Sequence, residues 1–115
     1  MNFNKFTIKA QEAIHNGLEL AQNENHQAVE PAHILRGLLS DPENVSVSIL
    51  KKIGVSIPDL DDKLKSTIKT FPIVKGASVS GQYLSNNTKA VFDAAREQAS
   101  DLGDEYISSE HVLLG

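Results

Sequence analysis

The fold is decided by two stretches of sequence that align without a gap: FTIKAQEAIHNGLELAQNENHQAVEPAHILRG at residues 6–37 and LSNNTKAVFDAAREQASDLGDEYISSEHVLLG at residues 84–115. The alignment matches Phe6 to Leu84 at its start and Gly37 to Gly115 at its end. Few positions are identical, among them His33 and His111, but apolar residues pair with apolar residues where a helix would face inward. The chain is therefore predicted to contain an internal repeat.

Each copy is predicted to hold a long amphipathic helix followed by a short apolar one. The long helices open at Thr7 and Ser85, which are good N-cap residues, and apolar side chains follow each of them at helical spacing. Small residues are common on the inward stripes, so we expect the two long helices to approach each other closely. The short helices begin near Pro31, which suits the first helical position, and near Glu110, which the helix dipole favours in a first turn.

Two further helices are predicted between the copies. Asp41 and Pro42 are expected to begin a third helix, which Gly54 ends. The sequence SIPD at residues 56–59 matches a capping box and opens a fourth helix that continues to about Thr70. The first copy therefore extends into a unit of four helices.

The expected fold class is all-α, a pseudo-twofold duplicated helical bundle of two four-helix repeats. The chain stops at Gly115, which matches Gly37 at a point where the first copy continues. We therefore expect the second repeat to be truncated and the chain to be a fragment of a longer one. The chain is interpreted as one domain, 1–115, with repeat 1 at about 6–70, a linking loop at about 71–83 and partial repeat 2 at about 84–115.

The composition is that of an ordinary globular domain. Of the 115 residues, 40% are hydrophobic and 23% are charged, so one folded core is expected. There is no cysteine, which removes disulfides, thiol catalysis and thiolate metal sites. A net charge of -4 with scattered basic residues predicts no binding to nucleic acid or to an anionic membrane. Because no signal peptide or membrane-spanning run is evident, a cytoplasmic protein is expected.

No motif in the sequence indicates a catalytic chemistry. Residues 76–83, GASVSGQY, match a phosphate-binding loop only in part, because the lysine is missing. His33 and His111 recur at equivalent positions, which favours a shared packing role over metal binding. Asp104 and Glu110 are interpreted as parts of a solvated turn and a helix start. We therefore expect no catalytic residue, cofactor or metal in this domain.

Four segments resemble the Clp amino-terminal domain family, and the similarity runs along the whole chain. They are FTIKAQEA at residues 6–13, EPAHIL at 30–35, GV at 54–55 and DEYISSEH at 104–111. Within this family, two further segments are more similar to the ClpB disaggregases than to ClpA or ClpC, the protease-linked unfoldases. These segments are FPIVKG at residues 71–76 and YLS at 83–85.

The resemblance implies a chaperone domain that is tethered by a flexible linker to two AAA+ ATPase modules. In the family, this domain engages unfolded or aggregated polypeptide through an apolar groove and helps to deliver it to the ATP-driven pore. The resemblance also implies a stress-response parent protein, a homohexamer that cooperates with an Hsp70 system. ATP and magnesium would belong to the AAA+ modules, none of which lies in this chain, so the chain itself is not expected to be an enzyme.

The resemblance also names candidate residues for polypeptide binding. Thr7, Asp104 and Glu110 match family positions that are linked to this role. Gln98 and His111 stand where some members carry leucine. We expect them at the groove, where they would make its apolar surface smaller or shift it, and would weaken the capture of unfolded chain.

Two other functions remain as alternatives. The first is adaptor docking by the N-domain of a protease-linked unfoldase of the ClpA or ClpC type. A protease-docking loop in the rest of the parent protein would favour it, whereas a long coiled-coil insertion would favour the disaggregase. The second is a small hydrolase that uses His33 or His111 with an acidic partner. The repeat argues against a hydrolase, because catalytic sites are rarely duplicated at matching core positions.

Overall fold

The computed structural model of the chain describes residues 3–73, 82–104 and 106–114. Within these residues there are six helices and two short strands: α1 (Ile8–Asn23), β1 (Ala28–Val29), α2 (Pro31–Leu39), α3 (Val45–Lys52), α4 (Ile57–Ile68), β2 (Tyr83–Leu84), α5 (Asn86–Asp101) and α6 (Ser109–Leu114). The all-α fold class is confirmed. Most of the predicted linking loop lies outside the described residues.

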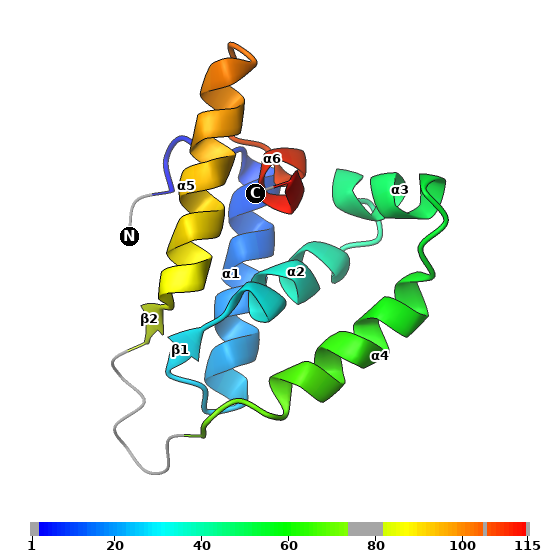
Figure 1. Cartoon of the computed structure of the whole chain (residues 1–115), viewed down its shortest axis with the longest axis vertical. Coiled ribbons are helices and arrows are strands. Elements are labelled where there is room, and N and C mark those ends of the chain that lie inside the picture. Colours follow the sequence, from blue (N-terminus) through cyan, green and yellow to red (C-terminus); the bar gives the residue numbers. More distant parts are fainter. Residues whose placement is uncertain (1–2, 74–81, 105, 115) are drawn as a thin grey trace.

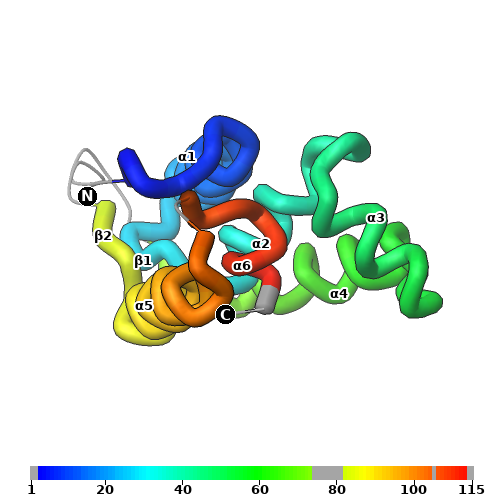
Figure 2. The backbone as a smooth tube through the Cα atoms, turned by 90° about the horizontal axis from the view of Figure 1, so that it is seen from above, coloured from blue at the N-terminus to red at the C-terminus, as the bar shows by residue number. Residues whose placement is uncertain are grey.

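The two long helices, α1 and α5, lie on opposite sides of a middle layer (Figures 1 and 2). This layer holds α2, α6 and the two short strands. Within it, α2 packs mainly against α1, and α6 packs mainly against α5. The remaining helices, α3 and α4, extend to one side of this arrangement, and α4 packs against α2.

Small residues bring α2 close to α1. Gly17 of α1 faces α2, where an added Cβ would lie 2.8 Å from the carbonyl oxygen of His33. Gly37 of α2 faces α1, where an added Cβ would collide with the carbonyl oxygen of Ala13. The prediction that small residues bring the two long helices together was wrong, because α2 and α6 occupy the space between them.

Two short parallel pairings connect the two copies of the repeat. β1 pairs with β2, with Val29 opposite Leu84, and Phe6 forms an isolated parallel bridge with Ile107. The alignment of the copies relates Phe6 to Leu84 and Val29 to Ile107. In both pairings, therefore, the segment before one long helix pairs with the segment after the other. Neither pairing was predicted, since a two-residue strand leaves no alternating pattern to recognise in the sequence.

The predicted starts of the long helices and of α2 are confirmed. Thr7 Oγ1 accepts the backbone N–H of Ala10 at 3.2 Å, and Ser85 Oγ accepts that of Thr88 at the same distance. Both are N-cap bonds, which satisfy backbone donors that the first turn leaves without partners. Pro31 is the first residue of α2. These features depend on residues close in sequence, which is why the sequence predicts them well.

The start of α3 differs from the prediction. Asp41 and Pro42 do not begin the helix, because the carboxylate of Asp41 accepts the backbone N–H of Glu43 at 3.0 Å and forms a turn. The N-cap is Asn44, whose Oδ1 accepts the backbone N–H of Ser46 at 2.9 Å. Pro42 therefore lies in a turn before the helix and not in its first turn, as had been predicted.

The end of α3 and the bounds of α4 lie close to the prediction. Gly54 follows α3 with φ of 89°, a left-handed conformation that glycine adopts without strain. Ser56 is the N-cap of α4, with its Oγ 3.5 Å from the backbone N–H of Asp59. The helix ends at Ile68, slightly before Thr70.

The core joins residues from both copies. The rings of Phe3, Phe6 and Phe92 meet edge to face, with centroids 5.5 to 5.7 Å apart. Such edge-to-face pairs are favourable beyond the area they bury. Because Phe92 lies on α5 and the other two precede α1, this cluster ties the start of one long helix to the other. No helix in the described part of the chain is long and apolar enough to cross a membrane.

Candidate functional site

The predicted binding residues Thr7, Asp104 and Glu110 lie around the turn that joins α5 to α6. The backbone N–H of Thr7 donates to the carbonyl oxygen of Ile107 at 2.8 Å. Asp104 and Glu110 come shortly before and after Ile107, so the structure brings the three residues to the segment between α5 and α6, whose place Figure 1 shows. Thr7 is half-buried, whereas the two acidic residues are exposed.

His111 lies beneath this turn, with only 4% of its surface exposed. Its Nδ1 atom accepts the backbone N–H of Ser108 at 2.9 Å. In a neutral imidazole one nitrogen accepts and the other carries the proton, so we assign the proton to Nε2. Nε2 lies 3.0 Å from Oδ2 of Asp104 and donates to it. The ring therefore caps the start of α6 and contacts Asp104 at the same time.

The hydroxyl of Ser108 extends these contacts to Glu110. Ser108 Oγ lies 3.0 Å from His111 Nδ1, and it donates to Oε1 of Glu110 at 3.0 Å. Asp104, His111, Ser108 and Glu110 thus form one continuous row of polar contacts. We call these four residues the α6 cluster. Two of the predicted binding residues, Asp104 and Glu110, stand at its ends.

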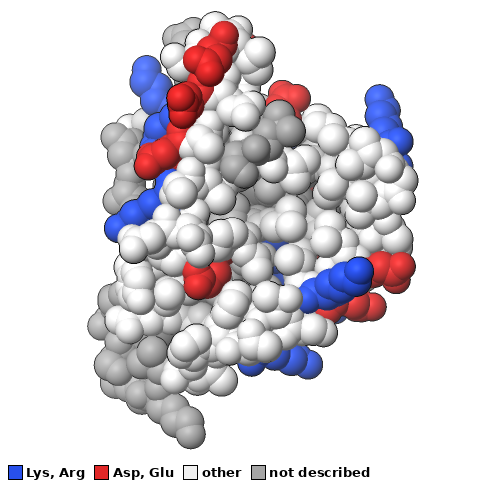
Figure 3. All heavy atoms as spheres, viewed as in Figure 1, with Lys and Arg blue, Asp and Glu red and all other residues white. Residues whose placement is uncertain are grey.

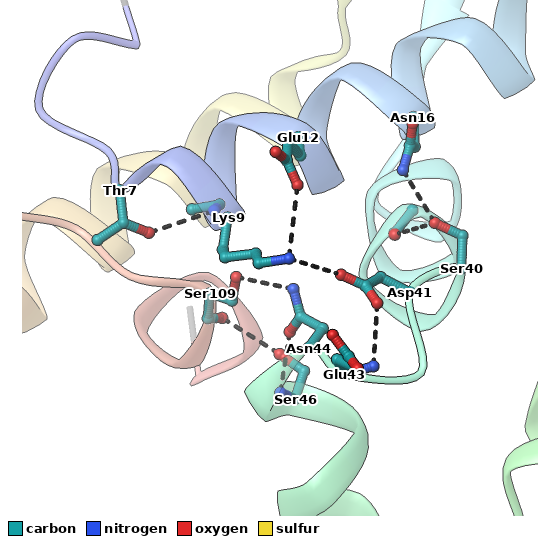
Figure 4. Close-up of polar contacts among 12 residues, drawn as sticks. Thr7, Lys9, Glu12, Asn16, Ser40, Asp41, Glu43, Asn44, Ser46 and Ser109 are labelled. Carbon is teal, nitrogen blue, oxygen red and sulfur yellow. Dashed lines mark hydrogen bonds and ion pairs between the residues drawn. The ribbon is translucent and has the colours of Figure 1, made fainter.

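Buried polar contacts anchor the start of α6 to α3 (Figure 4). Asn44 Nδ2 donates to Ser109 Oγ at 3.0 Å, and Ser46 Oγ lies 3.4 Å from the carbonyl oxygen of Ser109. The turn before α3 also contacts α1, because Lys9 Nζ lies 3.3 Å from Oδ2 of Asp41. α3 directly, and α1 through the turn before α3, therefore hold the start of α6 in place.

Ser108, His111 and Asp104 are the three types of group that a serine hydrolase combines, but their arrangement is that of a helix cap. The Nδ1 lone pair already accepts the backbone N–H of Ser108, and the Ser108 hydroxyl donates to Glu110. No nitrogen of the ring is left to act as a base toward the hydroxyl. The geometry therefore supports the packing interpretation of His111 over the hydrolase alternative.

The first copy holds an equivalent group of residues at the start of α2, which we call the α2 cluster: His26, Glu30, His33 and Phe71. His33 Nδ1 accepts the backbone N–H of Glu30 at 2.9 Å, and His33 Nε2 lies 3.0 Å from His26 Nδ1. The Phe71 ring packs against both imidazoles. Burial, and then the adjacent His26 ring, lower the pKa of His33 from 6.5 to about 4.

The two clusters share the capping histidine but differ in the groups around it. The alignment of the copies places His26 at the position of Asp104, and Ala32 at the position of Glu110. At these two positions the first copy therefore has an imidazole and a methyl group, whereas the second copy has two carboxylates. Sequence reasoning noted the repeated histidines but missed their partners, although the equal spacing of each pair along the chain was visible.

Exposed apolar side chains lie close in sequence to Asp104 and Thr7. Leu102 and Tyr106, which flank Asp104 in the sequence, are 67% and 53% exposed. Ile8, directly after Thr7, is 74% exposed. Exposed apolar groups that gather around polar ones are typical of interaction surfaces. The sequence analysis did not single out these residues, because their exposure depends on the geometry of the turn.

The other two candidate residues, Gln98 and His111, lie on different elements of the fold, Gln98 on α5 and His111 on α6. Gln98 is half-buried on α5, and its carbonyl oxygen accepts the backbone N–H of Leu102 at 3.1 Å. His111 faces inward, toward Asp104 and Ser108, as described above. The structure thus places Gln98 one turn before the exposed Leu102, and His111 under the turn that follows it.

A separate apolar hollow of about 350 Å³ lies between α2, α4, α5 and α6. It lies on the largely uncharged surface between α5 and α4 in Figure 3. The described residues that line it are all apolar: Pro31, Ala32, Ile34, Leu35, Leu38, Leu64, Val91, Val112 and Leu113. The hollow is therefore a second surface at which an apolar group could be buried.

Among the residues that the structure describes, no three His, Asp or Glu side chains lie close enough together to hold a metal ion. The candidate site is thus made of exposed apolar side chains, two carboxylates and a capped helix start. Such a surface can bury apolar groups and accept hydrogen bonds from a partner.

The fold is that of a Clp N-domain, the module found in Clp/Hsp100 chaperones. The Clp repeat (R) N-terminal domain family matches residues 5–115, and the chain belongs to this family.

ClpB chaperones are among its curated relatives. The ClpB chaperone of Bacteroides thetaiotaomicron is 40% identical over 114 residues, and that of Porphyromonas gingivalis is 33% identical over the same length. Each alignment covers 99% of this chain and 13% of the relative. The chain therefore spans only a small part of the length of these relatives.

Solved structures of Clp N-domains share the fold. The N-terminal domain of ClpD, a caseinolytic protease associated chaperone from Arabidopsis thaliana, is 26% identical, with a TM-score of 0.70 over 97% of this chain and 75% of that one. The ClpV N-domain from Vibrio cholerae has a TM-score of 0.83 at 18% identity, over 97% of this chain and 66% of that one. A ClpV N-domain has also been solved in complex with a VipB peptide, with a TM-score of 0.82.

Proposed function

We propose that the chain is the substrate-engaging N-terminal domain of an ATP-dependent Clp/Hsp100 protein disaggregase of the ClpB type. In this role it binds unfolded or aggregated polypeptide and delivers it to the AAA+ pore of the parent protein. The observation that carries the proposal is the α6 cluster, whose carboxylates lie with Thr7 around the segment between α5 and α6, close in sequence to the exposed Leu102 and Tyr106.

The chemistry of this surface suits an unfolded chain. Unfolded polypeptide exposes apolar side chains together with backbone N–H groups. Leu102 and Tyr106 offer apolar area, while the exposed carboxylate of Glu110 is an acceptor for N–H donors and basic side chains. The burial of two such side chains contributes at most a few kcal/mol at about 25 cal/mol per Å², before the costs of association. Weak binding by one domain is therefore expected.

Weak binding by one domain is compatible with strong binding by the parent protein. We infer a homohexameric parent, in which several N-domains act on one polypeptide and raise the overall affinity by their high effective concentration. ATP and magnesium are assigned to the AAA+ modules, the chain itself is non-catalytic, and the parent acts in the cytoplasm with an Hsp70 system. The ClpB relatives support this assignment.

The proposal is tested by the binding of a permanently unfolded probe, reduced and carboxymethylated lactalbumin with a fluorescent label. Fluorescence anisotropy measures the affinity of the chain and of Leu102→Ser. The matched control is Ile53→Ser at the end of α3, because Ile53 is 69% exposed, close to the exposure of Leu102.

The proposal expects about threefold to tenfold weaker binding for Leu102→Ser and an unchanged affinity for Ile53→Ser. Equal effects of the two substitutions, or no saturable binding by the unmodified chain, would contradict it.

A second candidate is adaptor docking, which the similarity to ClpD, a protease-associated chaperone, favours. In this case the partner would be a folded protein, and the unfolded probe would not compete with it. The parent protein separates the two candidates, since a protease-docking loop in its second ATPase module would favour adaptor docking. A long coiled-coil insertion in the first module would favour the disaggregase.

A further inference from the structure

We propose that Asp104 and His111 are positioning residues for Glu110, and that they act through Ser108. On this proposal, Glu110 contacts the polypeptide, and Asp104 serves it through a chain of hydrogen bonds instead of forming an independent contact. The inference rests on the proposed function, because it assigns different roles to two residues of the same binding site.

The first step fixes the protonation of the buried ring. Asp104 Oδ2 and His111 Nε2 are 3.0 Å apart, and only 5% of the His111 side chain is exposed. A carboxylate accepts hydrogen bonds and donates none, so it favours the ring form that carries its proton on Nε2. Asp104 thereby keeps Nδ1 of His111 available as an acceptor.

The second step concerns the two donors of Ser108. Its backbone N–H lies 2.9 Å and its Oγ 3.0 Å from Nδ1. When Nδ1 accepts the backbone N–H, the hydroxyl proton is available to Glu110 Oε1, 3.0 Å away. If the ring proton moved to Nδ1, the backbone N–H of Ser108 would lose its acceptor. The hydrogen bonds are complete only in the ring form that Asp104 favours.

The third step orients Glu110. Its carboxylate is exposed, and an exposed glutamate samples several rotamers that binding must restrict. The Ser108 hydroxyl holds one carboxylate oxygen, Oε1, while the side chain stays exposed to solvent. A partner therefore meets an acceptor that is already oriented, which lowers the ordering cost of binding.

The first copy supports this division of roles by comparison. The α2 cluster has the same histidine cap, but His26 replaces the carboxylate of Asp104, and Ala32 stands where Glu110 would be. In the α2 cluster, the contacts of His33 lead to the buried ring of His26, and Phe71 packs against both rings. The histidine cap thus occurs in both copies, whereas the two carboxylates occur together in the second copy.

The proposal is first tested without any partner, by NMR on the chain labelled with ¹⁵N and ¹³C. Asp104→Ala is expected to change the ring nitrogen shifts of His111 and the side-chain carboxyl shift of Glu110. Asp104→Asn, which retains an acceptor for Nε2–H, is expected to restore both. In Ser108→Ala, the carboxyl shift of Glu110 is expected to stop responding to Asp104→Ala, while Ser108→Thr preserves the response.

Affinity for the unfolded lactalbumin probe then tests the division of roles. Asp104→Ala and Glu110→Ala are each expected to weaken binding about threefold, and the double variant no more than Glu110→Ala alone, because coupled residues are not additive. Asp104→Asn is expected to bind like the unmodified chain. Asp101→Ala, at the exposed end of α5, is the control for a loss of surface charge, and thermal unfolding verifies that each variant folds.

The failures of the two proposals are distinguishable. If the carboxyl shift of Glu110 ignores Asp104→Ala, or if the binding losses simply add and Asp104→Asn does not restore affinity, the positioning role is overturned and Asp104 is a direct contact. If the NMR results hold but the chain binds no unfolded polypeptide, the positioning of Glu110 stands and the proposed function fails.

Discussion

The α2 and α6 clusters place the same histidine cap in two different environments. In the α2 cluster, His33 packs against another imidazole and a phenyl ring, and its own exposure is 0%. In the α6 cluster, His111 contacts a half-exposed carboxylate, and a hydroxyl leads from it to a second one. The difference suggests that duplication supplied one stable cap geometry, which the first copy uses for packing and the second uses to present charge.

The largest expected effect comes from truncation of the two caps. His33→Ala removes the hydrogen bonds that the backbone N–H of Glu30 and Nδ1 of His26 make to the ring, and it opens a cavity, so we expect a loss of about 3 to 4 kcal/mol in unfolding free energy. His111→Ala should cost less, about 1 to 2 kcal/mol, because Asp104 is already in contact with water. Urea denaturation measures both. A larger loss for His111→Ala would reverse the comparison.

The next effect is a dependence of stability on pH that arises from His33. The unfolded chain takes up a proton on this residue near pH 6.5, whereas the folded chain does so only near pH 4. Between these values the unfolded state binds more protons. The contribution of His33 to stability is therefore fully present above pH 6.5, and it is lost as the pH falls toward 4. The shift corresponds to roughly 3 kcal/mol across this range.

A pair of variants isolates this contribution from the protonation of carboxylates. Urea denaturation of His33→Gln at pH 7 and pH 4.5 should show a smaller loss of stability than the unmodified chain. His15→Gln, a change at an exposed histidine, should leave the loss unaltered. If all three chains lose the same stability, the buried His33 does not cause the pH dependence.

A smaller effect is expected where the long helices meet the short ones. Gly17 of α1 and Ala95 of α5 occupy equivalent positions in the two copies. Gly17→Ala places a Cβ 2.8 Å from the backbone of α2 and should cost about 1 to 3 kcal/mol, even though alanine favours a helix. Ala95→Gly should cost about 1 to 2 kcal/mol, through helix propensity and the loss of a buried methyl group. Thermal unfolding would contradict this account if Gly17→Ala were stabilising.

The smallest effect concerns charge at the α6 cluster. Glu110→Gln keeps the size of the side chain and its acceptor for Ser108, so unfolding free energy should change by less than about 0.5 kcal/mol. Affinity for the unfolded probe should fall about twofold to threefold, and most at low salt, since surface charges are screened by ions. Glu43→Gln, at an exposed site before α3, should leave affinity unchanged. A similar loss for both variants would show a general effect of net charge.

The sequence predicted the features that depend on near neighbours. Thr7 and Ser85 act as N-caps as expected, because each bonds to a backbone N–H within the same turn. The start of α3 was misplaced, because Pro42 suits both a first helical turn and the tight turn that Asp41 closes with Glu43. Local pattern alone does not separate these two uses of proline.

Contacts that depend on the folded chain could not be predicted from the sequence pattern. The pairing of Phe6 with Ile107 joins residues that lie far apart in the chain and form no recognisable strand. The contact of Asp104 with His111 depends on how the turn between them folds. The repeat showed that both histidines have the same role, but it did not show that their partners differ.

The central claim is that the α6 cluster binds polypeptide and the α2 cluster does not. Titration of the ¹⁵N-labelled chain with unlabelled, reduced and carboxymethylated lactalbumin tests it most directly, because NMR reports both clusters in one experiment. We predict shift changes at Thr7, Leu102, Asp104 and Glu110, with the amides of His26, Ala32 and His33 unmoved. Equal changes at both clusters, or changes confined to the α2 cluster, would contradict the claim.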